Sequence, residues 1–550
     1  MTQMQDVLPP ETVSMDTRDG TRLDADVYRP SGGTDHPVLL MRQPYGRRIA
    51  NTICYAHPAW YAAHGYIVVI QDVRGRGSSE GKFVLFEHEG EDGADAIAWA
   101  ASLPGSSGSV GMYGFSYQGT AQLLAAAHLA PALKAVAPAM IGWDIRNDWA
   151  FENGAFCLAA NLGWAVQLAA QEARRAGDTA AFAELVQAAQ GLALGTIRHA
   201  SPDLMVRHAR YAPHYERWLT SAAHDPFWDM ISPAAQSATL TGEGPPALFV
   251  SGWYDTHLPG TVAAYRAYEA AGAIAELIVG PWPHFPWGRR IAGHDFGDAA
   301  IGDLDQRQLA WFDRHLKGID QADVHEATVR LFDVGDRHWR GLDRWPTAEL
   351  GWGMASGGQA TLDERDGILM PNAMKSGAID YVVHDPWRPV PTVGGAFATL
   401  SGPADRTDVD ARPDVLTYTS APLQEPLMLA GTPVVNLAIA ADRPSFDISC
   451  VLATVDAGGR SRYLSDGYVT VREMDVGSIA TPCKPVCATL AVGERLRLSI
   501  AGASFPAYPI NPGTGRDAID AQVDELEIVT LRLDPGGSTI FLPVAIGKEL

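Results

Sequence analysis

Long apolar runs are absent from this sequence. The most apolar stretch, residues 155–170, is interrupted by Asn161 and Gln167 and is too short to cross a bilayer. The first twenty residues contain neither the basic segment nor the apolar segment of a secretion signal. The sequence therefore predicts a cytoplasmic protein without a membrane partner.

Positive charge is also scarce. Lys and Arg number 42 against 64 Asp and Glu, which gives a formal charge of −22. A surface of this sign repels nucleic acid and anionic membranes and favours solubility. We therefore expect no nucleic-acid partner, and we look for a small-molecule substrate.

Cysteine is rare, with five residues among 550. Cys54, Cys157 and Cys450 stand in apolar surroundings, which is typical of buried thiols. Cys483 and Cys487, in Thr-Pro-Cys-Lys-Pro-Val-Cys, could form a metal or redox pair, but no second pair or nearby histidine cluster supplies the other ligands that zinc needs. We expect no metal and no cofactor.

The chain is too long for one hydrophobic core, and its patterns change along its length. Residues 1–142 alternate short apolar runs with helical spacing, as in a parallel α/β sheet, and this pattern returns over 237–320. Residues 143–236 form an insertion with helical spacing throughout. Residues 321–550 have short alternating segments between Gly, Pro and Asp clusters, which predicts an all-β module, a sandwich or jelly roll. We expect strands at 38–41, 66–70, 110–113, 135–137, 247–251 and 276–279, helices at 92–103, 118–129 and 304–317, and a strand of the β module at 328–332.

A serine stands between a strand pattern and a helix pattern in Val110–Gly119, Val-Gly-Met-Tyr-Gly-Phe-Ser-Tyr-Gln-Gly. A strand, a sharp turn and a helix are typical of the nucleophile elbow of α/β-hydrolases, where small neighbours let the backbone turn tightly around the serine. The helix N-terminus behind Ser116 can stabilise an oxyanion. Gly119 is the third residue after Ser116, whereas the usual motif has glycine at the second, and a plain loop serine is the alternative. We predict that Ser116 is the nucleophile.

A serine nucleophile needs a base and an orienting carboxylate, which follow it in the order acid, then histidine, in this fold. Asp255 comes directly after the strand pattern 247–251, and His284 after the pattern 276–279. Carboxyl ends of parallel strands are where open α/β sheets place their sites. A turn aspartate and a loop histidine are the alternatives, but their joint order favours a triad with Ser116. His257 is the rival base, and it is too close in sequence to Asp255, so we assign it to the pocket lining.

Several long motifs, in the same order along the chain, resemble those of a known family. The chain resembles the family of bacterial cocaine esterase, shared by X-Pro dipeptidyl-peptidases and α-amino acid ester hydrolases. The matching residues are Asp19–Leu23, Tyr28–Pro30, Pro44–Gly46, Asp72–Gly81, the Ser116 elbow, Gly252–Asp255, Gly280–Trp282 with His284, Trp311–Asp313, Asp414–Ser420, and Asn511–Pro512 with Thr514–Gly515. The resemblance implies an α/β-hydrolase core, a helical cap inserted within it, and a C-terminal jelly roll.

The resemblance also implies an oxyanion hole. It would consist of the backbone N–H of Tyr117 and the hydroxyl of Tyr45, since a phenol donates a hydrogen bond without carrying charge. Packing of Tyr45 beneath the cap is the alternative.

The substrate is less constrained. Aminoacyl ester hydrolases of the family hold the substrate ammonium with acids after the catalytic aspartate, and here no acid follows Asp255; Asp148 and Glu152 in the insertion leave that specificity partly open. Trp149 and Trp164 match two tryptophans of the family's aromatic acyl pocket, with core packing as the alternative, and His257 makes one wall more polar.

We therefore expect an esterase for bulky or aromatic acyl groups. X-Pro dipeptidyl-peptidase activity and amide or β-lactam side-chain acylase activity are the alternatives, and a non-catalytic binding protein is a further one. The apolar strands of the β module also leave a homodimer open.

Overall fold

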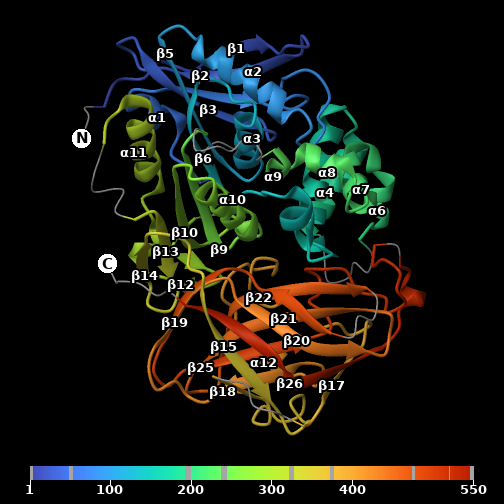
Figure 1. Ribbon diagram of the computed structural model, residues 1–550. Helices are drawn as coiled ribbons and strands as arrows, with labels where there is room; N and C mark the ends of the chain where they lie inside the picture. Colours follow the sequence, from blue (N-terminus) through green and yellow to red (C-terminus); the bar gives the residue numbers. More distant parts are fainter. Residues whose placement is uncertain are drawn as a thin grey trace.

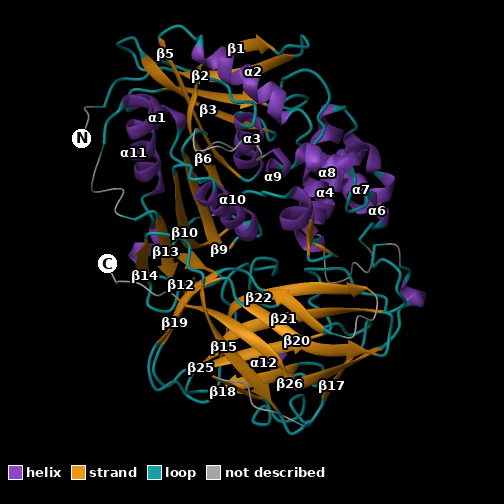
Figure 2. Ribbon diagram, in the orientation of Figure 1, coloured by secondary structure: helices purple, strands orange, loops and turns teal. Residues whose placement is uncertain are grey.

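The computed structural model describes residues 4–48, 54–191, 200–236, 244–285, 287–320, 327–371, 377–472, 477–519 and 521–544. Figure 1 shows three parts: a sheet flanked by helices, a group of helices beside it, and a β-rich module beneath both. Helices concentrate in the first two parts and strands in the third (Figure 2).

The core is one mixed sheet with the order β1-β2-β4-β3-β5-β6-β9-β10-β13-β14. The strands from β4 to β13 in this order run parallel, and the antiparallel pairs β1–β2 and β13–β14 lie at the two ends. The bounds are Glu11–Asp16 for β1, Arg22–Tyr28 for β2, His36–Gln43 for β3, Ile67–Asp72 for β4, Ser106–Phe115 for β5, Leu133–Ala139 for β6, Ala247–Tyr254 for β9, Ala275–Pro283 for β10, Val329–Asp333 for β13 and His338–Leu342 for β14. The six strands expected between residues 38 and 279 are all present.

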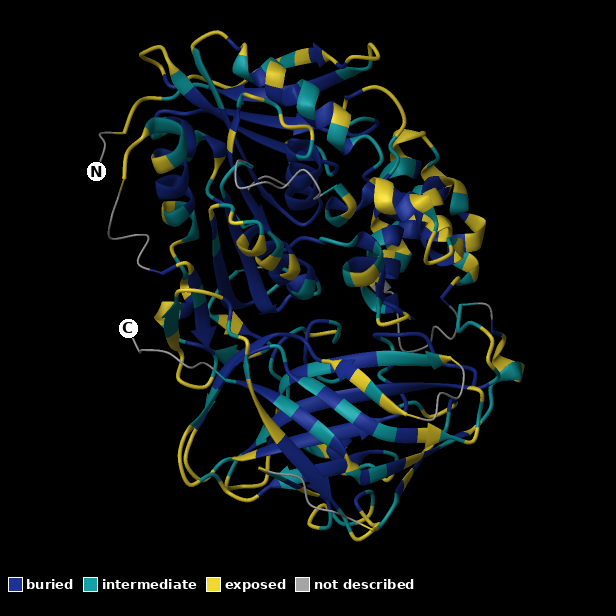
Figure 3. Ribbon diagram, in the orientation of Figure 1, coloured by how far each residue is buried: buried dark blue, intermediate teal, exposed yellow. Residues whose placement is uncertain are grey.

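Helices cover both faces of this sheet, and the strands are buried between them (Figure 3). On β3, Val38 and Leu40 pack in the cluster that includes side chains of α2, α3 and α10, whereas Leu39 and Met41 pack with α1 and α11. Successive side chains of a strand point to opposite faces of the sheet, and here both faces are buried. This explains why the strands appear in the sequence as continuous apolar runs. The helix bounds are Pro58–Ala63 for α1, Glu89–Ala101 for α2, Tyr117–Ala126 for α3, Leu258–Ala270 for α10 and Leu304–Lys317 for α11. Within the described residues, no helix combines the length and apolarity needed to span a bilayer.

The insertion is mostly helical, as expected, but it begins differently. Residues 146–150 form a π-helical turn, η1, and a short hairpin follows, made of β7 (Phe151–Glu152) and β8 (Ala155–Phe156). Asn153 and Gly154 form its turn with positive φ values of 44° and 88°. An Asn-Gly turn is a hairpin signal, so the expectation of helical structure throughout was wrong here. The helices of the insertion are α4 (Leu158–Arg175), α5 (Thr179–Gly191), α6 (Asp203–Arg207), η3 (Ala209–Tyr211), α7 (Pro213–Thr220), α8 (Pro226–Ile231) and α9 (Pro233–Gln236).

The C-terminal module is β-rich, with one sheet of 12 strands among the described residues. The strand expected at 328–332 does not belong to it, because β13 pairs in parallel with β10 and so extends the core sheet. The jelly-roll topology of the C-terminal module stays a prediction. The bounds are Ala348–Ala355 for β15, Ile368–Pro371 for β16, Asp380–His384 for β17, Thr407–Asp410 for α12, Leu416–Ser420 for β18, Leu427–Gly431 for β19, Val434–Ala441 for β20, Ser445–Val455 for β21, Ser461–Arg472 for β22, Ser478–Pro482 for β23, Val486–Leu490 for β24, Arg495–Ala501 for β25 and Val529–Val544 for β26.

Three small elements remain near the junctions of these parts. They are the hairpin β11 (Arg290–Ile291) with β12 (His294–Asp295), and the 3-10 turns η5 (Asp298–Ile301) and η7 (Val523–Glu525). The five cysteines are all free thiols, and Cys483 and Cys487 are both buried. No group of three or more potential metal ligands occurs in the described ranges.

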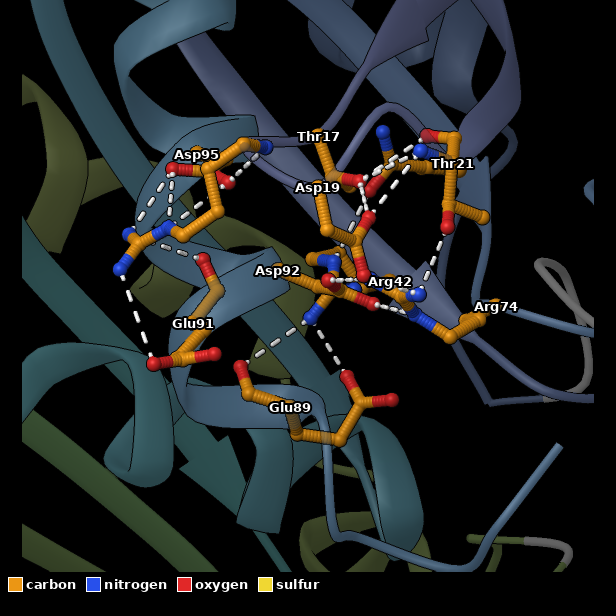
Figure 4. A network of polar contacts seen from close by, with 11 residues as sticks. Thr17, Asp19, Thr21, Arg42, Arg74, Glu89, Glu91, Asp92 and Asp95 are labelled. Carbon is orange, nitrogen blue, oxygen red and sulfur yellow. Dashed lines mark hydrogen bonds and ion pairs between the residues drawn. The ribbon is translucent and has the colours of Figure 1, made fainter. Parts of the chain in front are cut away.

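A network of ion pairs ties the start of the chain to the core (Figure 4). Arg74, in the loop after β4, binds Asp92 of α2 at 2.6 Å and Asp19 of the β1–β2 turn at 2.7 Å. Asp72 accepts hydrogen bonds from the backbone N–H and the guanidinium of Arg47 at 2.6 and 2.5 Å. These contacts brace the loops on either side of the carboxyl ends of β3 and β4.

Candidate active site

Ser116 lies in the turn between β5 and α3, with φ 61° and ψ −128°. A positive φ at a residue other than glycine is strained, and such strain concentrates at functional sites. A Cβ on Gly119 would meet Cγ2 of Ile141 at 2.4 Å and the carbonyl oxygen of Ala139 at 2.8 Å, so glycine is needed where α3 crosses β6. The side chain of Gln118 is accommodated at the preceding position, where its Oε1 accepts from the N–H of Phe115 at 3.3 Å. This packing explains why glycine is third after Ser116.

Asp255 and His284 lie side by side at the carboxyl ends of two paired strands. Asp255 follows β9 directly and is fully buried, and His284 follows β10. Nδ1 of His284 lies 2.8 Å from Oδ1 of Asp255, while the hydroxyl of Ser251 donates to Oδ2 of Asp255 at 3.3 Å. The carboxylate therefore fixes the orientation of the imidazole.

Ser116 and His284 line the same cavity of about 420 Å³. The ring of Phe115, which precedes the serine, lies 5.5 Å from the imidazole of His284. The cavity is lined by Tyr45, Phe115, Ser116, Gln118, Trp149, Ala160, Trp164, Gln167, Gln171, Thr256, His257, His284, Phe285, Ala396 and Ser401. Core, cap and C-terminal module all contribute to this lining, and it contains no acidic side chain among the described residues.

Tyr45 projects into this cavity from the loop after β3. Its hydroxyl accepts from the indole N–H of Trp164 at 3.1 Å, and Ser116 lines the same cavity. Tyr45 is half-buried and lines the cavity, and burial raises the pKa of Tyr45 to about 12. The phenol therefore stays protonated at neutral pH and can donate a hydrogen bond.

Tyr117 begins α3, and its side chain anchors the first turn of that helix. Its hydroxyl donates to Glu89 of α2 at 2.8 Å, and Glu89 binds Arg42 of β3 at 2.5 Å, a pair visible in Figure 4. The ring stacks on Phe86 with centroids 4.5 Å apart. The position of the Tyr117 backbone N–H beside Ser116 is thus held by buried contacts.

The predicted acyl pocket forms one aromatic wall of the cavity. The rings of Trp149 and Trp164 lie 5.2 Å apart, and the imidazole of His257 lies 3.9 Å from Trp149. Burial lowers the pKa of His257 to about 3, so this imidazole is neutral at physiological pH. The wall is apolar with one uncharged polar ring.

Asp148 and Glu152 do not line this cavity. Asp148 accepts the backbone N–H groups of Trp143 and Asp144, and burial raises its pKa well above the usual range. Glu152 binds Lys484 of the C-terminal module at 3.0 Å and accepts from Tyr508 at 2.6 Å. Both carboxyl groups are held by these partners, and both residues line a separate cavity of about 220 Å³.

Sequence reasoning missed part of the lining. Ala160, Trp164, Gln167 and Gln171 recur at spacings of four and three on one face of α4, and this periodicity could have identified the two glutamines. Ala396 and Ser401 come from the C-terminal module, and no local pattern marks them.

The comparisons with known proteins agree with this architecture. Residues 19–286 match the model of X-Pro dipeptidyl-peptidase (S15 family), and residues 322–532 match the X-Pro dipeptidyl-peptidase C-terminal non-catalytic domain. Cocaine esterase of Rhodococcus sp. (strain MB1 Bresler) is 31% identical, over 97% of this chain and 98% of its own.

Two solved structures show the same fold over nearly the whole chain. An aminopeptidase from a marine sediment Thaumarchaeota archaeon superposes with a TM-score of 0.81 at 23% identity, covering 99% of this chain and 97% of its own. An α-amino acid ester hydrolase superposes with a TM-score of 0.79 at 24% identity, covering 98% of this chain and 97% of its own.

Fold and site together define an α/β-hydrolase core with an inserted helical cap and a C-terminal β-rich module. The chain belongs to the cocaine esterase and X-Pro dipeptidyl-peptidase family of serine hydrolases. The resemblance predicted from its motifs is confirmed, and so is the hydrolase fold.

Proposed function

We propose that this serine hydrolase cleaves carboxylic esters with Ser116 as nucleophile, His284 as base and Asp255 as its orienting partner. The observation that carries the proposal is the opening of Ser116, His284 and Tyr45 into one cavity, with Asp255 buried behind the imidazole at 2.8 Å. A nucleophile, a base and a carboxylate in this order constitute the machinery of acyl transfer.

The reaction proceeds through an acyl-enzyme. His284 removes the proton of Ser116 as Oγ attacks the ester carbonyl, and Asp255 stabilises the imidazolium that forms. Tyr45 and the N–H of Tyr117 donate to the oxyanion. The alcohol leaves with the proton from His284, and water then repeats the sequence on the acyl-enzyme.

The cavity lining favours an uncharged, bulky acyl group. Trp149 and Trp164 offer apolar surface whose burial contributes roughly 25 cal/mol per Å². An α-amino acid ester or an X-Pro peptide carries an ammonium group, which needs a carboxylate, and the described lining has none. Asp148 and Glu152 are held by other partners. These contacts support an aromatic acyl ester over the alternatives.

A panel of p-nitrophenyl esters tests this preference. We expect kcat/KM to rise about 10- to 100-fold from acetyl to benzoyl, because an apolar wall rewards a buried ring, and to fall for aminoacyl esters. An X-Pro p-nitroanilide and a β-lactam amide complete the panel. Faster cleavage of the aminoacyl ester or the X-Pro amide would exclude the proposed substrate class.

Tyr45→Phe is expected to lower kcat by about 10²–10³-fold, the usual effect of removing one oxyanion donor. KM should change little, since the hydroxyl acts mainly on the charge of the transition state. Steady-state kinetics with the benzoyl ester measure both constants. Tyr55→Phe is a matched control, because its buried hydroxyl makes no hydrogen bond within the described residues. An unchanged kcat in Tyr45→Phe would remove Tyr45 from the oxyanion hole.

A further inference from the structure

Trp164 contacts the reaction centre in a second way besides lining the acyl wall. Its indole N–H donates to the hydroxyl oxygen of Tyr45 at 3.1 Å. A phenol has a single hydrogen, and when its oxygen accepts a bond from one side, that hydrogen is directed to another partner. Ser116 lines the same cavity as this hydroxyl. The indole therefore restricts the directions in which the phenol hydrogen can point.

The helix that carries the indole, α4, is joined to the loop that follows β4. Arg76 binds Glu172 of α4 at 2.5 Å and also contacts Gln171, while its Nε donates to the carbonyl oxygen of Pro44 at 2.7 Å. Pro44 directly precedes Tyr45, so one buried guanidinium connects the cap helix to the backbone of the tyrosine loop. Only 2% of the Arg76 side chain is exposed.

A second arginine strengthens this connection. Arg175, at the end of α4, donates to the carbonyl oxygens of Gly77 and Ser79 at 3.0 and 2.8 Å. The helix that carries Trp164 is thus joined to the loop after β4 and, through Arg76, to the backbone that precedes Tyr45.

We infer that Trp164 is a positioning residue for the oxyanion hole. Its N–H occupies one lone pair of the Tyr45 oxygen and leaves the O–H aimed at the carbonyl that Ser116 attacks. The cap thereby takes part in the chemical step as well as in binding the acyl group. This inference rests on the proposed function, because it requires Tyr45 to donate to the oxyanion.

The test is a double-mutant cycle between Trp164→Phe and Tyr45→Phe. Phenylalanine keeps an aromatic ring on the acyl wall and removes the N–H donor together with part of the ring, so KM and the double-mutant cycle separate the two losses. We expect Trp164→Phe to lower kcat about tenfold, the scale of one hydrogen bond, with KM changed less than about threefold. In the Tyr45→Phe background the same substitution should change kcat less than about twofold, because its acceptor is already gone.

Trp218→Phe is the matched control. Trp218 is a buried cap tryptophan 6.3 Å from Trp164, and its indole nitrogen has no hydrogen-bond partner among the described residues. It does not line the active-site cavity, so Trp218→Phe reports only cap repacking, and kcat should stay within about twofold of the wild type. A tetrahedral trifluoromethyl ketone adduct gives a second readout, since its Ki should rise in Trp164→Phe by the same factor as kcat/KM falls.

The outcomes distinguish a failure of the inference about Trp164 from a failure of the proposed function. A loss in Trp164→Phe that is equal in both backgrounds, a loss confined to KM, or an equal loss in Trp218→Phe would overturn the inference and leave the proposed function intact. An unchanged kcat in Tyr45→Phe would overturn the oxyanion assignment of the proposed function, and the inference with it. A fall in kcat and a rise in Ki that both disappear without the Tyr45 hydroxyl would establish the role of Trp164.

Discussion

Ser116→Ala is expected to lower kcat by about 10⁵–10⁶-fold, because removing the nucleophile of a serine hydrolase leaves only binding and the oxyanion hole to act. The fold should survive, since the Ser116 side chain makes no capping hydrogen bond to α3 and alanine adopts the same positive φ at a similar cost. Single-turnover kinetics with the preferred p-nitrophenyl ester measure the loss.

Labelling by a fluorophosphonate gives the direct readout. The wild type should be labelled at residue 116, and Ser116→Ala should not be labelled at all. Ser401→Ala is the matched control, since Ser401 opens into the same cavity and its hydroxyl donates to the carbonyl oxygen of Ala396 at 2.8 Å. Residual labelling of Ser116→Ala, or activity above a few per cent, would place the nucleophile elsewhere. A wild type that is neither labelled nor active on the ester panel would favour the alternative of a non-catalytic binding protein.

Much of the core could be predicted because its strands are buried on both faces. Such strands read as continuous apolar runs, and the turn that follows each one leaves a polar residue at the carboxyl edge of the sheet. β9 and β10 are neighbours in sequence and in space, so Asp255 and His284 had to lie close together. The elbow at Ser116 could also be predicted from the sequence, because small neighbours are needed where α3 crosses β6.

Other features depend on contacts that a local pattern does not record. The strand at 329–333 alternates like those of the β module, and only its pairing with β10 places it in the core sheet. Ala396 and Ser401 reach the cavity because the C-terminal module packs beneath the cap. Glu152 could have held an ammonium group by sequence, and its ion pair with Lys484, 332 residues away, removes that option.

These distant contacts share a consequence for specificity. The proposed catalytic groups come from strand ends of the core, whereas most of the proposed acyl-binding lining comes from α4, η1 and the C-terminal module. The two sets of groups therefore lie mostly on different elements, with Trp164 as the proposed link between them, and the family includes both esterases and peptidases.

Asp255→Asn is expected to lower kcat by about 10⁴-fold while preserving the shape of the site. Asparagine can still accept from Nδ1 of His284, and Ser251 can accept from its amide in place of donating. What is lost is the negative charge, in a fully buried position 2.8 Å from the imidazole, where a charge acts strongly on the imidazolium that forms as Ser116 attacks.

Asp333→Asn provides the matched comparison for Asp255→Asn. Asp333 is another fully buried aspartate at the end of a core strand, and it accepts from Thr489 and Arg340 of neighbouring elements. Its replacement should lower the thermal unfolding midpoint and leave kcat within a few-fold of the wild type, since no part of it reaches the cavity. Asp255→Asn should show the reverse pattern, with a large loss in kcat and a smaller change in unfolding. If both variants lose kcat only in proportion to their loss of folded protein, the buried carboxylate at 255 is structural, and the imidazole at 284 acts without it.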